Sequence, residues 1–487
     1  MRNWKLPAIA ALAAGIAACT VGPDHVRPDV QTPARFASEA QPDPSSSPEM
    51  PADPAAEAEF WNGFNDPLLS RLVEQALAAN HDLRIALANV DRASALLGGA
   101  KFDALPTITA NAEARDTRAS AAQLPGVGRD GRDVKSYSAG FRASWELDLF
   151  GRIRRGIEAQ AAQAEASAAD LAAAQVVVAA EVASTYAGLR GLQERLRVAR
   201  DNARNQLDTL RLVEVRLGAG RGTEFDTSRA TAQLETTRSR IPALESAIAI
   251  AMHRIAVLTG QTPDALVAEL QPEQPLPALP ARIDAGTPGE LLRRRPDVAA
   301  AEQRLHAATA RIGVATADLF PRFTLGGLLG SQAIDSSALF ERASETRLVA
   351  LGVDWSFLDR GHVRARIAAS EAGASGELAR YEQTVLRALE DAENALARYA
   401  HARVEDAHLQ RAADSSSRAA ELARTRFDAG ATDLFEVLDA ERTRLQSQDA
   451  LAVARTQSVA SAIAVYRSLA GGWPTRIPVR KEIAGTH

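Results

Sequence analysis

The residues of this sequence with the most distinctive chemistry are a single cysteine and a group of three carboxylates. Cys19 is the only cysteine among 487 residues, so it can be acylated but cannot form an intrachain disulfide. Asp433, Glu436 and Asp439 are spaced three residues apart, which predicts that they share roughly one face of a helix. Carboxylates that lie close together repel one another and attract cations. The chemistry expected of this group is therefore electrostatic rather than covalent.

The residues before Cys19 have the composition of an export signal. Arg2 and Lys5 precede an apolar run over 6–18, which is too short to cross a bilayer of about 30 Å as a helix. We therefore expect residues 1–18 to be a signal peptide. The sequence I-A-A-C that ends at Cys19 resembles the lipobox of bacterial lipoproteins, in which the cysteine becomes the acylated N-terminus. An ordinary signal peptide with an incidental cysteine is the alternative.

Thr20 follows the cysteine, where many lipoproteins that stay in the inner membrane have an aspartate. The resemblance therefore implies export to the outer membrane. Because a single lipid anchor holds a protein only weakly, we expect a second membrane attachment elsewhere in the chain.

The composition excludes several classes of protein. A mean hydropathy of −0.16 excludes a polytopic helical membrane protein, and a net charge of −5 offers no basic surface for nucleic acid. Hydrophobic residues make up 46% of the chain but aromatic residues only 5%, so much of the apolar content is alanine, which suits long, closely packed helices. The sequence has no nucleophile elbow or metalloprotease motif, and its histidines are scattered. We therefore expect no enzyme activity, no metal site, and no cofactor other than the lipid on Cys19.

The sequence contains one internal repeat. The matching pairs are Asp82 and Asp297, 215 residues apart, and Trp145 with Trp355 and Gly220 with Gly430, each 210 apart. The change in offset falls in a loop rich in glycine and arginine before Trp145. The two copies are expected to span 66–261 and 289–472.

Each repeat is predicted to contain a strand hairpin followed by a long helix and a returning helix. Apolar and polar residues alternate strictly over 137–149, which is typical of a strand with one apolar face. The expected elements are hairpins over about 104–150 and 320–358, long helices over 152–217 and 362–428, return helices over 223–259 and 432–470, and a helix over 296–318. Outside the repeats we expect an extended lipid-anchored segment over 19–65, a Pro-rich linker over 262–288, and a tail over 473–487.

Four strands cannot close a transmembrane barrel by themselves, because the smallest such barrels have about eight. Open sheet edges are not tolerated in lipid. Either several chains assemble, or the strands form a soluble sheet on a coiled-coil stalk. Aromatic side chains near the strand ends favour the membrane, since such residues gather at membrane interfaces; they are Trp145, Phe150, Trp355 and Phe357.

Six segments carry a family resemblance. They are C-T-V-G-P-D-H-V-R-P (19–28), F-W-N-G-F-N-D-P-L-L (60–69), R-P-D-V-A-A-A-E-Q-R-L (295–305), W-S-F-L-D-R-G (355–361), V-L-D-A-E-R (437–442) and L-A-G-G-W (469–473). With these segments the chain resembles the TolC-like outer-membrane factors, in the lipoprotein branch of OprM- and NodT-type efflux proteins. The resemblance implies an α+β membrane protein. It would be a homotrimer in which each chain gives four strands to a twelve-stranded β-barrel that continues into a long periplasmic α-helical barrel.

The same resemblance implies a function and partners. The chain would be the outer-membrane exit duct of a tripartite efflux system, passing small molecules. Its partners would be a periplasmic adaptor protein and an inner-membrane pump of the resistance-nodulation-division type. A type I protein-secretion duct and a non-conducting lipoprotein stalk remain as alternatives.

By resemblance, the tunnel has a gate at its periplasmic tip. Glu436 and Asp439 align with the acidic ring positions of the family, and Asp433 extends that group. In a trimer such carboxylates form rings of like charge, which suggests a selectivity and pH element. Arg426 and Phe427 align with the basic and aromatic positions that latch the tip, although phenylalanine replaces a common tyrosine here. A solvated helix face is the alternative.

Two helix–turn–helix tips are implied to contact the adaptor. Exposed glycine turns allow the backbone of another chain to approach closely. The implied residues are Arg216, Leu217, Gly220, Thr223 and Asp226 in the first tip and Gly430 and Thr432 in the second.

Overall fold

The computed structural model describes residues 20–38, 60–280, 283, 285–469 and 478–480. Cys19 and the expected signal peptide before it lie outside the described residues. The chain divides into two compact units. The first gathers the residues up to 29 with 89–167 and 300–382, and the second gathers 30–88, 168–299 and 383–487. Each unit is described by itself below.

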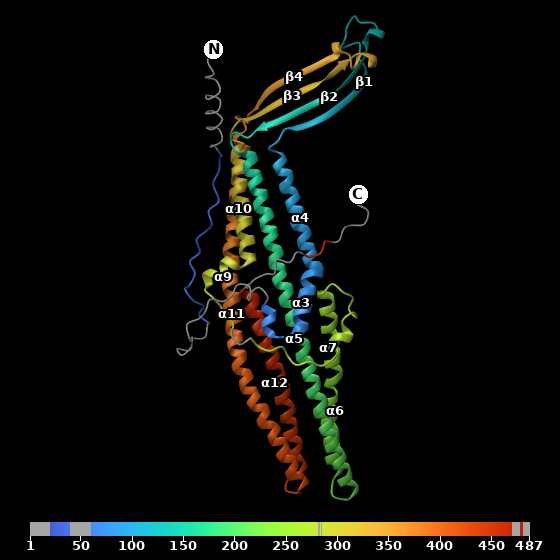
Figure 1. Ribbon diagram of the computed structural model, residues 1–487, viewed down its shortest axis with the longest axis vertical. Coiled ribbons are helices and arrows are strands. Elements are labelled where there is room, and N and C mark those ends of the chain that lie inside the picture. Colours follow the sequence, from blue (N-terminus) through green and yellow to red (C-terminus); the bar gives the residue numbers. More distant parts are fainter. Residues whose placement is uncertain (1–19, 39–59, 281–282, 284, 470–477, 481–487) are drawn as a thin grey trace. The chain divides into compact units, whose positions relative to one another are not determined.

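The first unit contains one antiparallel sheet of four strands in chain order (Figure 1). The strands are β1 (Thr107–Arg118), β2 (Asp133–Leu147), β3 (Arg322–Ala333) and β4 (Glu345–Asp354). The pairing of β2 with β3 joins the two predicted hairpins into a single sheet. Among the described strands, β1 and β4 have one neighbour each, so one chain leaves two edges open for pairing with other copies.

The register places most of the large apolar side chains of the four strands on one face of the sheet. Residues paired across an antiparallel ladder share a face. One such row contains Ile108, Ala143, Gly327 and Val349, and the next contains Ala110, Phe141 and Leu329, with the charged Arg347 at its β4 end. The opposite face carries mostly polar or small residues, such as Thr109, Arg142, Asn111, Gly140 and Thr346, with Leu328 and Leu348 as exceptions. Because Ile108, Phe141, Leu329 and Val349 are exposed, the apolar face has the character of a lipid-facing barrel wall.

Each strand is preceded or followed in the sequence by a long helix. The helices α4 (His81–Phe102) and α10 (Pro296–Ala317) lead into β1 and β3, while α5 (Arg152–Gly218) and α11 (Arg360–Asp428) follow β2 and β4. The 67 residues of α5 correspond to about 100 Å of helix. The order of elements in the first half of the chain is therefore repeated in the second half.

The first unit also has three short 3-10 helices, η2 (Asp130–Arg132), η3 (Ser336–Ala338) and η4 (Arg342–Ser344), and the second unit contains the other helices. They are η1 (Phe60–Phe64), α3 (Pro67–Ala79), α6 (Glu224–Arg238), α7 (Arg240–Leu258), α8 (Val267–Leu270), α9 (Pro288–Arg294) and α12 (Leu434–Leu469). The stretch expected as one return helix over 223–259 is divided at Ser239. Pro242 explains the break, because it cannot donate a backbone hydrogen bond to Arg238 and its ring crowds that carbonyl.

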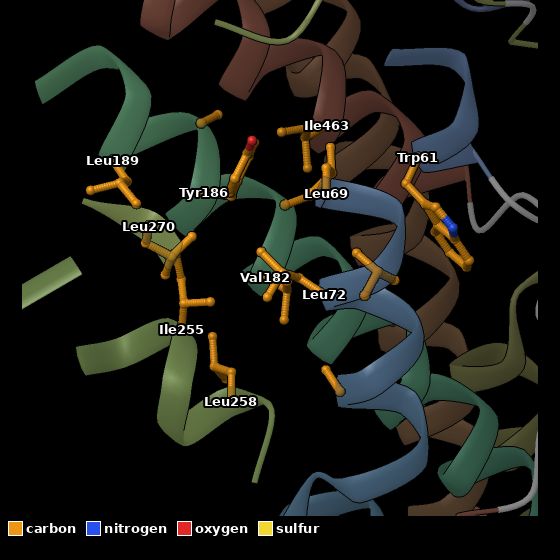
Figure 2. Close-up of a cluster of buried hydrophobic side chains, with 14 of the residues drawn as sticks. Trp61, Leu69, Leu72, Val182, Tyr186, Leu189, Ile255, Leu258, Leu270 and Ile463 are labelled. Atoms are coloured by element: carbon orange, nitrogen blue, oxygen red, sulfur yellow. The ribbon is translucent and has the colours of Figure 1, made fainter. Parts of the chain in front are cut away.

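The core of the second unit is built from residues far apart in the sequence. Figure 2 shows Leu72, Val182, Ile255, Leu270 and Ile463 converging from α3, α5, α7, α8 and α12. By length and composition, α5 and the stretch 224–258 each contain a window apolar enough to cross a membrane. Burial in this cluster accounts for part of that apolar character, as at Val182 and Ile255, whereas Val177, Ile250 and Val257 are exposed.

A buried arginine ties the Pro-rich stretch to α5. Arg190 donates through Nη1 to the carbonyls of Leu270 and Pro272, at 3.4 and 2.9 Å, and its guanidinium lies 4.8 Å from the centroid of the Tyr186 ring. The Tyr186 hydroxyl donates to Asp66 at 2.7 Å, and burial raises the pKa of Tyr186 to about 12. Although 262–288 was expected to be a linker, α8 within it packs into the core.

Replacing Arg190 with alanine is expected to release this stretch. The loss of hydrogen bonds from a buried cation costs about 1.5–3 kcal/mol, which corresponds to roughly 10- to 100-fold more frequent opening. Limited proteolysis of detergent-solubilised protein measures the more frequent opening as faster cleavage within 262–288. The variant R211A, in which an exposed arginine is lost, is the control and should cleave like the parent protein; equal rates for R190A would contradict the prediction.

Candidate functional site

The two helix–turn–helix tips of the second unit have the same turn chemistry. In the first, Gly220 has a φ of +70° and the amide of Arg221 donates to the carbonyl of Arg216 at 2.8 Å. In the second, Gly430 has a φ of +73° and the amide of Ala431 donates to the carbonyl of Arg426 at 2.8 Å. Both turns end a long helix in the left-handed conformation that favours glycine.

The residues after each turn cap the returning helix. Thr223 and Asp226 bond reciprocally to each other's backbone amides at the start of α6. Asp433 holds the equivalent position before α12, where its Oδ1 accepts from the amide of Glu436 at 3.2 Å. The expectation that Asp433 lies on a helical face with the other acids is therefore wrong, because α12 begins at Leu434. Its carboxylate is engaged as a cap.

A contact between Arg216 and Phe427 joins α5 to α11. Arg216 donates through Nη2 to the carbonyl of Phe427 at 3.0 Å, and its guanidinium lies 3.8 Å from the centroid of the Phe427 ring. The ring is buried in a small apolar cluster with Val213, Leu234, Leu434 and Val437. A residue expected at the adaptor-docking tip and one expected at the gate thus form a single contact, which we call the Arg216–Phe427 clasp.

A cleft of about 220 Å³ lies beside the clasp. It brings together five residues singled out in the sequence: Arg216, Asp226, Phe427, Thr432 and Asp433. The hydroxyl of Thr432 is buried and has no hydrogen-bond partner within the described part of the chain. Leu217, Gly220 and Gly430 are not among the residues that line this cleft.

The two acids of the expected ring each have a basic neighbour in the same chain. Glu436 lies 3.9 Å from Arg426, and Asp439 forms an ion pair with Arg442. These pairs are half-exposed or exposed, and such contacts contribute only about 0–1 kcal/mol. These weak ion pairs can be displaced at little cost.

Sequence reasoning missed an aromatic cluster on the tips. Phe225 and Phe435 are 67% and 54% exposed, and the guanidinium of Arg229 lies 5.4 and 4.9 Å from their ring centroids. Phe225 and Phe435 occupy matching positions, 210 residues apart. The repeat offset therefore carried the signal that could have identified them.

The predicted interface aromatics gather at one end of the sheet in the first unit. The indoles of Trp145 and Trp355 donate to the carbonyls of Ala104 and Leu319, both at 3.0 Å. Phe150 stacks on Phe320 with ring centroids 4.6 Å apart, and Phe357 lies 5.5 Å from Trp355. The helix-to-strand connections of both repeats thus accept the same tryptophan hydrogen bond, whereas the phenylalanines are arranged differently in the two repeats.

The described N-terminal segment begins at this aromatic end. The amide of Val21 donates to the carbonyl of Phe150 at 3.2 Å. Gly151 has a φ of +82°, and a Cβ added there would lie 2.6 Å from the Thr20 side chain, so the two backbones pack closely. Arg155 donates to the carbonyl of Val21 at 3.3 Å and to Asp24 at 2.5 Å.

Further contacts hold the segment along α10. The rings of His25 and His306 stack with centroids 4.5 Å apart, and Arg27 lies 3.3 Å from Glu302. Burial, reinforced by His306, lowers the pKa of His25. No local motif predicts these contacts. In the ranges that the structure describes, no group of three or more potential ligands could hold a metal ion.

Comparisons with known proteins agree with this architecture. A family model described as outer membrane efflux protein matches residues 72–261 and 287–471. The solved structure of the outer-membrane channel OprN is 41% identical with a TM-score of 0.86, covering 93% of this chain and 100% of that one. The pyoverdine export outer membrane protein OpmQ of Pseudomonas putida is 32% identical, covering 86% of this chain and 89% of OpmQ. Nodulation protein T of Rhizobium leguminosarum bv. trifolii is 29% identical, covering 90% of this chain and 91% of that protein.

The solved neighbours are trimeric channels, so the expected fold class is confirmed. The two open sheet edges are those that join three chains into one barrel of twelve strands. The chain belongs to the outer membrane efflux protein family, whose members are TolC-like outer-membrane channels.

Proposed function

We propose that the chain is the exit duct of a tripartite efflux system that passes small molecules out of the cell. The observation that carries the proposal is the joint presence of an apolar-faced sheet with two open edges and two helices of nearly 70 residues. Such a chain can close a membrane pore only as an oligomer, and its helices then form a passage on one side of the membrane. Conduction of this kind needs a pore and a gate but no covalent step.

Small molecules are favoured over proteins as cargo. The relative OpmQ is named for pyoverdine export, which makes a small-molecule duct the better reading than a type I secretion duct. A periplasmic adaptor and an inner-membrane pump, of the resistance-nodulation-division type, are the proposed partners. The exposed turns at Gly220 and Gly430 are the proposed adaptor contacts.

A lipid on Cys19 is part of the same proposal. Thr20, the next residue, packs against Gly151 at the aromatic end of the sheet. An acyl chain on the preceding cysteine would be attached one residue before Thr20, and Gly151 directly follows Phe150, whose residue type favours a membrane interface. This position supports a lipid anchor that supplements the barrel in the outer membrane.

Recording from purified trimers in planar bilayers tests conduction. We expect wild-type trimers to show small, cation-selective currents and the double variant E436A/D439A to lose most of that selectivity, because the carboxylates near the tip are removed. The double variant D201A/D208A, on the same helical unit but away from the expected ring, is the control. If neither the wild type nor E436A/D439A conducts, the duct is rejected in favour of a structural stalk.

A further inference from the structure

Glu441 is a carboxyl group buried between α5 and α12. The residue is 2% exposed, and its Oε1 lies 3.1 Å from the hydroxyl of Thr209 on α5, which divides its one proton between Glu441 and the carbonyl of Asn205, also at 3.1 Å. Its Oε2 has no hydrogen-bond partner among the described residues. An ionised carboxylate with a single hydrogen bond is costly to bury, and burial accordingly raises the pKa of Glu441.

Other buried polar groups near Glu441 also lack hydrogen-bond partners within the described residues. Gln206 is buried, and neither atom of its side-chain amide has a partner in the described ranges. Arg444 donates through Nε to Asn202 at 3.3 Å, whereas its Nη2 is buried without a partner in the same part of the chain. We call these residues, Asn202, Gln206 and Thr209 of α5 with Glu441 and Arg444 of α12, the α5–α12 seam. A buried acceptor and a buried donor thus lie one helical turn apart on α12 without being joined.

The charges that face Glu441 come from two helices. Arg444 on α12 and Arg424 on α11 both favour the ionised form, while α5 presents the neutral Thr209 and Gln206. Desolvation outweighs both cations. Burial therefore favours the neutral form of Glu441, and the two arginines favour the ionised form. We expect each form to favour a different position of the Arg444 guanidinium.

We propose that Glu441 is a proton-sensitive positioning residue of the gate, whose ionisation draws Arg444 away from Asn202 and loosens the α5–α12 seam. When Glu441 is neutral, the seam packs as described above. When it is ionised, the carboxylate recruits the unpartnered Nη2 of Arg444 or water. Because α12 also carries Glu436 and Asp439, a change in its packing on α5 reaches the tip. Only this last link rests on the proposed function.

The sign of the pH effect follows from the direction of the shift. A carboxyl whose pKa is raised in the folded chain binds more protons there than in the unfolded chain, so its stabilisation is present at low pH. That stabilisation is lost as the pH rises from the usual glutamate range through the raised pKa. The seam should therefore loosen as the pH increases.

Infrared spectroscopy of purified trimers tests the protonation itself. We expect the wild type to lose the absorption of a buried protonated carboxyl group as the pH rises, and E441Q to lack that absorption at every pH. The control E421Q, at an exposed position on α11, should retain the wild-type change. If E441Q keeps the wild-type pH-dependent absorption, the proposal is wrong.

Amide hydrogen exchange tests the mechanical consequence and does not require conduction. After correction for intrinsic exchange, peptides covering 202–213 and 437–448 should lose protection with rising pH in the wild type and show no such step in E441Q. The variant R444Q should move the step to higher pH, because the ionised carboxylate loses a cation, and should make it smaller, because no guanidinium is left to be drawn away from Asn202. Should E441Q fail to assemble, T209V serves in its place and should also move the step upward. If the pH-dependent loss of protection is unchanged in these variants, the proposal is wrong. If that loss occurs as expected but purified trimers carry no current, only the proposed duct is contradicted.

Discussion

Replacing Arg216 with alanine is expected to raise the mean current through purified trimers by about 10-fold or more. The clasp combines a hydrogen bond from a charged donor to the Phe427 carbonyl with a cation–π contact to its ring. A hydrogen bond to a charged group contributes about 1.5–3 kcal/mol, and a cation–π contact about 0.5–2 kcal/mol. Because about 1.4 kcal/mol changes an equilibrium tenfold, loss of the clasp should shift the tip strongly towards separation of α5 from α11.

Two controls separate this effect from a general loss of packing. R211A removes an exposed arginine of α5 whose ion pair is with its own helix, to Asp208, and should leave the current unchanged. R216K keeps the charge but not the planar group that stacks on the ring, so it should give an intermediate current. Planar-bilayer recording at fixed protein concentration provides the measurement. A current from R216A equal to that of the wild type would show that the clasp does not restrain the tip.

Replacing Cys19 with alanine should abolish lipid attachment completely. The thiol of Cys19 is the only one in the chain, so no second cysteine can take its place as the acylated residue. Metabolic labelling with palmitate, followed by purification of the protein, measures the loss directly. The variant T20S keeps the cysteine and should retain the label.

The C19A variant should still reach the outer membrane, although less of it will accumulate. The barrel supplies a second attachment, which is the condition for stable anchoring by one lipid. The N-terminal segment should remain in place, since Val21 and Arg155 hold it through contacts that do not involve Cys19. Label that persists in C19A would refute acylation at this residue.

Much of the local structure could be predicted from the sequence. Strict alternation over 137–149 predicted β2, and the structure has that strand over Asp133–Leu147. The uninterrupted stretch after Gly151 predicted a helix over 152–217, and α5 spans Arg152–Gly218. These features depend on the periodicity of the backbone and on single turn residues, which a short window of sequence contains.

Two of the predictions that were wrong or incomplete concern residues at the ends of elements. Asp433 was expected within a helix but caps it, because an aspartate before an apolar run satisfies free backbone amides better than it continues the helix. The division at Ser239 was likewise missed, although Pro242 carried the signal. Both outcomes depend on the identity of one residue at a helix end, where periodicity gives little guidance.

The sequence by itself determined the repeat, the periods of strands and helices, the glycine turns at Gly220 and Gly430, and a cysteine at the end of an export signal. Only the tertiary structure decided which faces meet. It paired β2 with β3, set Arg216 against Phe427 across 211 residues of sequence, and buried Glu441 although Asp439 and Arg442 beside it are charged and accessible to solvent. The physical reason is that periodicity is a property of local backbone geometry, whereas burial depends on partners that long-range packing brings together. Periodicity does not distinguish a glutamate on a helix surface from one in a helix seam, whereas burial in the α5–α12 seam raises the pKa of Glu441.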